Sequence, residues 1–159
     1  MPLRILLAAE FGPVRRSLET LLEQNEVDVV GQAADGPGIV ALARVLRPDV
    51  AILDLCLSRE ETLTLADDIR GTSGATRVIL VQGDPFDGDV HAVFGAGISG
   101  VVLRAKVADD LVRAIRDVGR GEYFLSPCAS RALVQAHLKP RLAAAPPCGR
   151  GSRPHGITN

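Results

Sequence analysis

The chain has 159 residues, enough for one domain with a hydrophobic core, and its net charge of −1 gives no overall basic field for nucleic-acid binding. Hydrophobic residues make up 47% and aromatic residues only 3%, which favours the aliphatic core of an α/β protein. The three cysteines form no metal-binding or disulfide pattern, and no apolar run is long enough to span a bilayer, so we expect a cytoplasmic protein without membrane contact.

Strand and helix patterns alternate along the chain up to about residue 118. Short apolar runs predict five strands, at residues 3–8, 27–33, 50–54, 77–82 and 100–103. Apolar residues at helical spacing predict a helix after each of them; among these positions are Leu18, Leu42, Ala66, Val93 and Ile115. Five β-α units in succession predict a doubly wound parallel sheet with right-handed crossovers and helices on both faces.

The pattern changes after residue 121. Leu133, Val134 and Leu138 predict a short further helix, and Pro127 fits its first turn. Residues 140–159 are rich in Pro and Gly and have little apolar periodicity. We therefore expect one domain over residues 1–122, a C-terminal helix and the start of a linker over 123–139, and a disordered linker or tail over 140–159.

One carboxylate stands out, because Asp54 lies at the end of the third predicted strand, directly after a run of apolar residues. In open α/β sheets the ligand and reaction sites lie at the carboxyl ends of the strands. Asp54 is therefore a candidate reactive group. The alternative is a carboxylate that only caps the following helix.

Six stretches of the sequence together resemble the receiver domain of response regulators, in particular its NarL/FixJ (LuxR-type) branch. These are RILLAAE (4–10), VVGQAADG (29–36), RPDVAILDL (47–55), GAGISG (95–100), LVRAIR (111–116) and GEYFLSP (121–127). The resemblance covers about residues 2–138. It implies the CheY-like, flavodoxin-like fold, with a five-stranded parallel sheet of order 2-1-3-4-5 and a short extra C-terminal helix.

The resemblance implies that Asp54 is the phosphoacceptor, because the family places its phosphorylated aspartate at this position. The carboxylate would attack phosphorus, and Mg²⁺ would neutralise the transferring group. In the family, two adjacent acids after strand one and the phosphoacceptor hold the ion. Here Ala9 and Glu10 stand where the two acids are expected, which leaves Glu10 and Asp54 as the candidate metal ligands.

The rest of the expected pocket also departs from the family pattern. Gln82 replaces the hydroxyl residue at the end of strand four, and Val101 replaces the switch aromatic. Arg104, with Lys106 two residues later, stands in place of the phosphate-binding lysine. We therefore expect an atypical receiver with impaired Mg²⁺-dependent phosphorylation, in which Asp54 is hydrogen-bonded or paired to Arg104.

The resemblance also implies a function without enzymatic turnover. The chain would be the signal-input and dimerisation domain of a DNA-binding transcriptional response regulator in a two-component or phosphorelay system. A sensor histidine kinase is the implied partner, and DNA would be bound only through a helix-turn-helix domain that this chain does not contain. We expect a homodimer, whose candidate interface residues on helices one and five are Arg15, Glu19, Val112, Ile115 and Arg116.

Two alternatives to this function remain open. The first is a ligand-sensing pseudo-receiver that controls antibiotic or secondary-metabolite genes, in which the cleft around Ala9, Asp54, Gln82 and Arg104 admits a small organic molecule. The second is a stand-alone protein-interaction receiver. No Gly-rich nucleotide loop or catalytic triad supports an enzyme on this scaffold.

Overall fold

The structure is a computed structural model that describes residues 3–83 and 90–127. Its elements are β1 (Arg4–Ala9), α1 (Gly12–Gln24), β2 (Asp28–Ala33), α2 (Gly36–Leu46), β3 (Val50–Asp54), α3 (Arg59–Thr72), β4 (Arg77–Gln82), α4 (Val90–Gly95), β5 (Ile98–Leu103), a 3₁₀-helix (Arg104–Lys106), α5 (Val107–Gly119) and β6 (Phe124–Leu125). All strands are parallel, in the order β2-β1-β3-β4-β5-β6. The predicted doubly wound α/β fold is confirmed.

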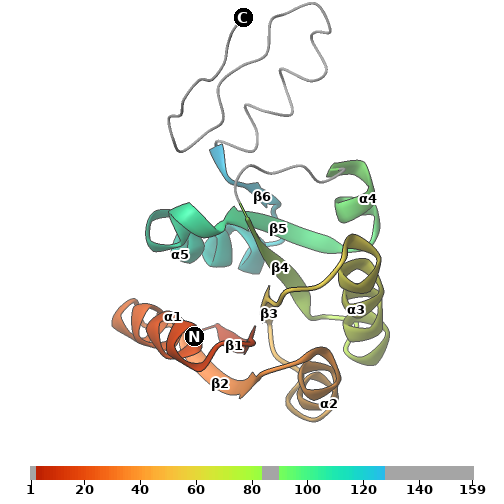
Figure 1. The fold of residues 1–159 in the computed structure, drawn as a ribbon, viewed down its shortest axis with the longest axis horizontal. Coiled ribbons are helices and arrows are strands. Elements are labelled where there is room, and N and C mark those ends of the chain that lie inside the picture. Colours follow the sequence, from red (N-terminus) through yellow and green to blue (C-terminus); the bar gives the residue numbers. More distant parts are fainter. Residues whose placement is uncertain (1–2, 84–89, 128–159) are drawn as a thin grey trace, which may run out of the picture.

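The helices form two layers around the sheet. Figure 1 shows α1 and α5 on one side of the strands and α2, α3 and α4 on the other. Successive side chains of a strand point to opposite faces, so Ile5 and Leu7 join the core under α1 and α5, whereas Leu6 and Ala8 join the core under α2 and α3. A strand buried on both faces needs apolar residues throughout, which explains the uninterrupted apolar runs. No helix in the described part of the chain is long and apolar enough to cross a membrane.

The sheet contains one strand more than the sequence analysis predicted. β6 pairs with β5, with Phe124 opposite Gly100. The buried Ser126 fixes this pairing, because its backbone N–H donates to the Val101 carbonyl at 3.0 Å and its hydroxyl accepts from the Leu103 N–H at 3.1 Å. Pro127 is helical, as predicted for the start of a C-terminal helix. The remainder of that predicted helix and residues 140–159 lie outside the described residues.

Side-chain caps set the start of the two helices that follow β2 and β3. The Asp35 carboxylate accepts from the Gly38 N–H at 2.8 Å, so α2 begins at Gly36. Before α3, the Ser58 hydroxyl accepts from the Glu61 N–H at 3.1 Å, and the Glu61 carboxylate accepts from the Ser58 N–H at 2.9 Å. This reciprocal capping box fixes the loop between β3 and α3 beside the carboxyl end of β3.

Candidate functional site

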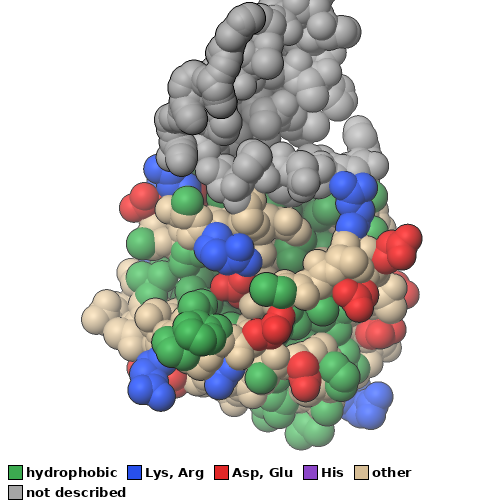
Figure 2. All heavy atoms as spheres, in the orientation of Figure 1, with side chains coloured by type: hydrophobic (Ala, Val, Ile, Leu, Met, Phe, Trp, Pro, Cys, Tyr) green, Lys and Arg blue, Asp and Glu red, His purple; other side chains and the backbone are tan. Residues whose placement is uncertain are grey.

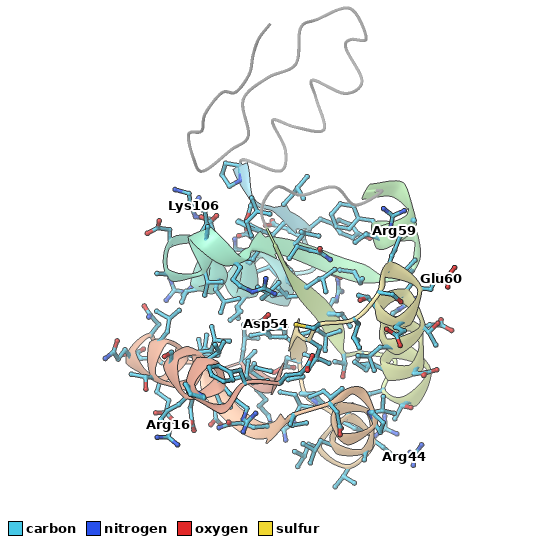
Figure 3. All side chains as sticks on the ribbon, viewed as in Figure 1. Arg16, Arg44, Asp54, Arg59, Glu60 and Lys106 are labelled. Carbon is cyan, nitrogen blue, oxygen red and sulfur yellow. The ribbon has the colours of Figure 1, made fainter. Side chains whose placement is uncertain are left out.

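Asp54 lies at the carboxyl edge of the sheet, where the ends of neighbouring strands surround it (Figure 3). In the β1–β3 register Ala9 is the residue opposite Asp54. Gln82 ends β4, and Arg104 directly follows β5. The parallel strands therefore bring these four predicted positions to one edge of the sheet.

Asp54 has an ionic partner on the segment after β5. Arg104 Nη2 donates to Asp54 Oδ1 at 2.7 Å. The Asp54 side chain is only 8% exposed, whereas the Arg104 side chain is 50% exposed. A Cβ atom at Gly83 would stand 3.6 Å from Arg104 Nη1, so the guanidinium also lies along the end of β4. The nearly buried carboxylate thus has a positive charge from the chain itself.

Glu10 and Arg15 bind backbone groups around this pair. Glu10 Oε1 accepts from the Cys56 N–H at 2.5 Å, which joins the end of β1 to the β3–α3 loop. Arg15 Nη1 donates to the Ala9 carbonyl at 2.6 Å. Neither contact was predicted from the sequence. A backbone N–H or carbonyl is present at every position, so such contacts leave no sequence signal.

The residues around Asp54 do not fit a Mg²⁺ ion, which requires oxygen ligands in near-octahedral geometry. Ala9 has no side-chain oxygen, Glu10 holds the Cys56 N–H, and one oxygen of Asp54 already accepts from Arg104. Within residues 3–83 and 90–127, no group of three or more His, Cys, Asp or Glu side chains is placed to hold a metal ion. The predicted ligand pair of Glu10 and Asp54 is therefore occupied by other contacts.

The remaining predicted pocket residues lie at different distances from Asp54. Gln82 is half-buried and lines a cavity of about 260 Å³ together with apolar residues that include Leu57, Leu80 and Val93. Val101 is buried within β5. Lys106 ends the 3₁₀-helix, and Figure 3 shows it at the outer edge of the molecule, away from Asp54. Arg104, rather than Lys106, is the cation placed at the carboxylate.

One of the predicted interface residues must be corrected. Ile115 is 0% exposed and belongs to the core under α1 and α5, so its side chain is unavailable to a partner. Glu19 and Val112 are half-buried, and Arg116 is exposed. Val112 and Arg116 also line a groove of about 410 Å³ together with Asn25 at the end of α1. Arg15 is half-buried as well, so the accessible part of the predicted surface is Arg15, Glu19, Val112 and Arg116.

Comparisons with known proteins agree on one kind of domain. The family model of the response regulator receiver domain matches residues 5–116. The response regulator protein VraR of Staphylococcus aureus is 26% identical over 128 residues, which are 80% of this chain and 61% of VraR. This chain thus spans about three fifths of the length of that relative.

Solved structures give the same result. A LuxR-family two-component response regulator from Aurantimonas sp. SI85-9A1 superposes with a TM-score of 0.77 at 27% identity, covering 87% of this chain and 99% of that one. The isolated receiver domain of RcsB from Salmonella enterica serovar Typhimurium superposes with a TM-score of 0.72 at 25% identity, covering 84% of this chain and 99% of the RcsB domain. A structure of two RcsB dimers bound to two parallel DNAs superposes with a TM-score of 0.73 at 25% identity, covering 84% of this chain and 69% of the RcsB chain.

Proposed function

The chain belongs to the response regulator receiver domain family, and from this premise we propose that it is an atypical receiver whose Asp54 is held by Arg104 in place of Mg²⁺. In this proposal it is the signal-input and dimerisation domain of a LuxR-family transcription regulator in the cytoplasm. The similarity to the Aurantimonas regulator and to VraR supports the branch. DNA would be bound by a separate helix-turn-helix domain, as the DNA complex of RcsB dimers suggests.

The observation that carries the proposal is the hydrogen bond between Arg104 and Asp54 opposite Ala9. Phosphoryl transfer to a carboxylate needs a free oxygen as nucleophile and a cation that neutralises the phosphoryl oxygens. Here the guanidinium already neutralises Asp54, and β1 offers no second acid beside it. The pocket therefore rests in a charge-balanced state without metal or phosphate. A sensor histidine kinase, if it contacts this domain, would meet a carboxylate that is already paired.

This proposal predicts that dimerisation does not depend on phosphorylation. We expect the same dimer fraction in sedimentation-velocity runs with and without acetyl phosphate and Mg²⁺. Val112→Arg should weaken the dimer by at least about tenfold, because a charge in an interface core costs more than about 1.4 kcal/mol. Val45→Arg is the matched control, since Val45 is 76% exposed on α2, on the opposite side of the sheet from α5.

Two outcomes would contradict the prediction of a dimer that forms through α1 and α5 without phosphorylation. A dimer that forms only with acetyl phosphate and Mg²⁺ would show that Asp54 is a working phosphoacceptor. A dimer that Val112→Arg leaves intact would place the interface elsewhere than on α1 and α5.

A further inference from the structure

A second feature of the molecule, separate from the Asp54 site, is an open groove between α2 and α3. Its volume is about 760 Å³. Its lining is mostly apolar and includes Pro37 and Val40 of α2, Leu65 of α3 and Leu57 of the β3–α3 loop. Pro37 is exposed and Val40 and Leu57 are half-buried, whereas Leu65 is 6% exposed and belongs to the core beneath the groove. This volume lies within the range of about 300–1,000 Å³ that is typical of ligand-binding pockets, and it can hold a short segment with small apolar side chains.

The rim of the groove is acidic. Its lining contains four carboxylates and one cation, namely Asp35, Glu60, Glu61, Asp68 and Arg44. Asp35 and Glu61 cap their helices, whereas Glu60 and Asp68 are exposed on α3. Figure 2 shows Asp and Glu side chains gathered on the side of the molecule that α3 forms, and Figure 3 shows Glu60 there. An occupant of this groove should therefore be apolar in the middle and positively charged at its ends.

The sequence of this chain contains one segment of that kind. Residues 123–159 hold five of the 18 Lys and Arg residues and none of the 19 Asp and Glu residues, so the first 122 residues carry 13 basic against 19 acidic side chains. Within the basic part, residues 142–147 read LAAAPP. Lys139 and Arg141 precede this apolar stretch, and Arg150 and Arg153 follow it. Charge and apolar pattern thus match the rim and the floor of the groove.

We propose that residues 139–153 of this chain dock in the groove between α2 and α3. The apolar stretch 142–147 packs on Pro37, Val40 and Leu57, and the flanking cations lie over Glu60 and Asp68. With the predicted helix continuing from Pro127 to residue 139 at about 1.5 Å per residue, and extended chain after it, the segment between Pro127 and residue 142 spans about 28 Å. Six strands about 4.8 Å apart make the sheet about 24 Å wide from β6 to β2, so this length reaches across one face of the sheet to the groove between α2 and α3. The docked segment covers the apolar groove and ties the C-terminal segment to the receiver body.

The chain offers its own probe for this contact. Cys56 is exposed and directly precedes Leu57 of the groove, and Cys148 directly follows the apolar stretch 142–147. A disulfide forms only when the two Cα atoms approach within about 7 Å. We expect that mild oxidation of the dilute full chain with diamide, in a Cys128→Ser background, gives a Cys56–Cys148 disulfide within one chain, measured by peptide mass spectrometry without reduction.

Charge changes then test the groove directly. Glu60→Lys with Asp68→Lys should lower the cross-linked fraction at least about threefold, and about 0.5 M NaCl should do the same by shortening the Debye length to ~4 Å. Lys139→Glu with Arg141→Glu should restore the cross-link in the groove variant. The control variant is Glu23→Lys with Asp28→Lys, which makes the same charge change at exposed positions of α1 and β2. It should leave the cross-linked fraction unchanged.

The proposal is overturned if the groove variant and the α1–β2 control variant cross-link to the same extent as the parent chain. It is equally overturned if the Cys56–Cys148 product joins two chains and rises with protein concentration, because the groove would then hold a segment of a second copy.

Discussion

Replacing Ala9 with Asp, Gln82 with Thr and Arg104 with Lys is expected to turn the Asp54 pocket into one that binds Mg²⁺ and accepts a phosphoryl group. Ala9 lies opposite Asp54 and is 1% exposed, so an aspartate there adds a second carboxylate beside the first. Removing the guanidinium frees the oxygen of Asp54 that Arg104 now holds. Two adjacent carboxylates then provide the oxygen donors that Mg²⁺ requires.

Chemical denaturation and intact mass would measure this conversion. Without Mg²⁺ the triple variant should be less stable than the parent chain, because two like charges share a nearly buried site. Mg²⁺ at ten times its dissociation constant should then raise the free energy of unfolding by about 1.4 kcal/mol. With acetyl phosphate and Mg²⁺ the variant should gain one phosphoryl group.

The control for this conversion is the same variant with Asp54→Asn, which should gain neither Mg²⁺ stabilisation of that size nor a phosphoryl group. If the triple variant responds to Mg²⁺ no more than the parent chain does, the three substituted residues are not what makes the pocket unsuitable for the ion.

Arg104→Ala is expected to lower the free energy of unfolding by about 1–2 kcal/mol. The Asp54 carboxylate is 8% exposed and would lose its ionic hydrogen-bond partner. Half of the Arg104 side chain is exposed, which keeps the loss below that of a fully buried pair. Urea unfolding measures this loss of stability. The matched control is Arg113→Ala, because Arg113 is an exposed arginine on α5. Its removal should change the free energy of unfolding by no more than about 0.5 kcal/mol.

A double-mutant cycle separates the pair from the rest of the site. Combining Arg104→Ala with Asp54→Asn should cost clearly less than the sum of the two single changes, since no carboxylate then remains without a partner. Additive losses would mean that the contact between Arg104 and Asp54 contributes nothing to stability.

The sequence predicted the strands best where tertiary structure buries both faces. The predicted bounds of β3 and β4 coincide with the structure, because the continuous apolar run of each doubly buried strand stops at a polar residue, namely Asp54 in β3 and Arg77 and Gln82 in β4. β5 begins at Ile98, two residues before the prediction, which began it at Gly100. Gly100 lies inside the strand, where a Cβ atom would come within 3.2 Å of both Ile79 and Val118. Close packing, rather than a turn, explains this glycine.

The site could be predicted only where a side chain at a strand end determines it. Arg104 lies beside Asp54 because the ends of parallel strands align, and the resemblance to the receiver family had indicated this pair. The contact of Glu10 with the Cys56 backbone and the two-residue strand β6 depend on tertiary contacts that leave no pattern. On α5, apolar core and interface positions look alike in the sequence, which is why Ile115 was wrongly included among the interface residues.

The most direct test of the account is acetyl-phosphate labelling of the unaltered chain with and without Mg²⁺, measured by intact mass beside Asp54→Asn. If Arg104 takes the place of the metal at Asp54, the mass should stay unchanged in both conditions and match the behaviour of the Asp54→Asn variant. A Mg²⁺-dependent gain of one phosphoryl group that the Asp54→Asn variant lacks would contradict the account and make this chain a conventional receiver.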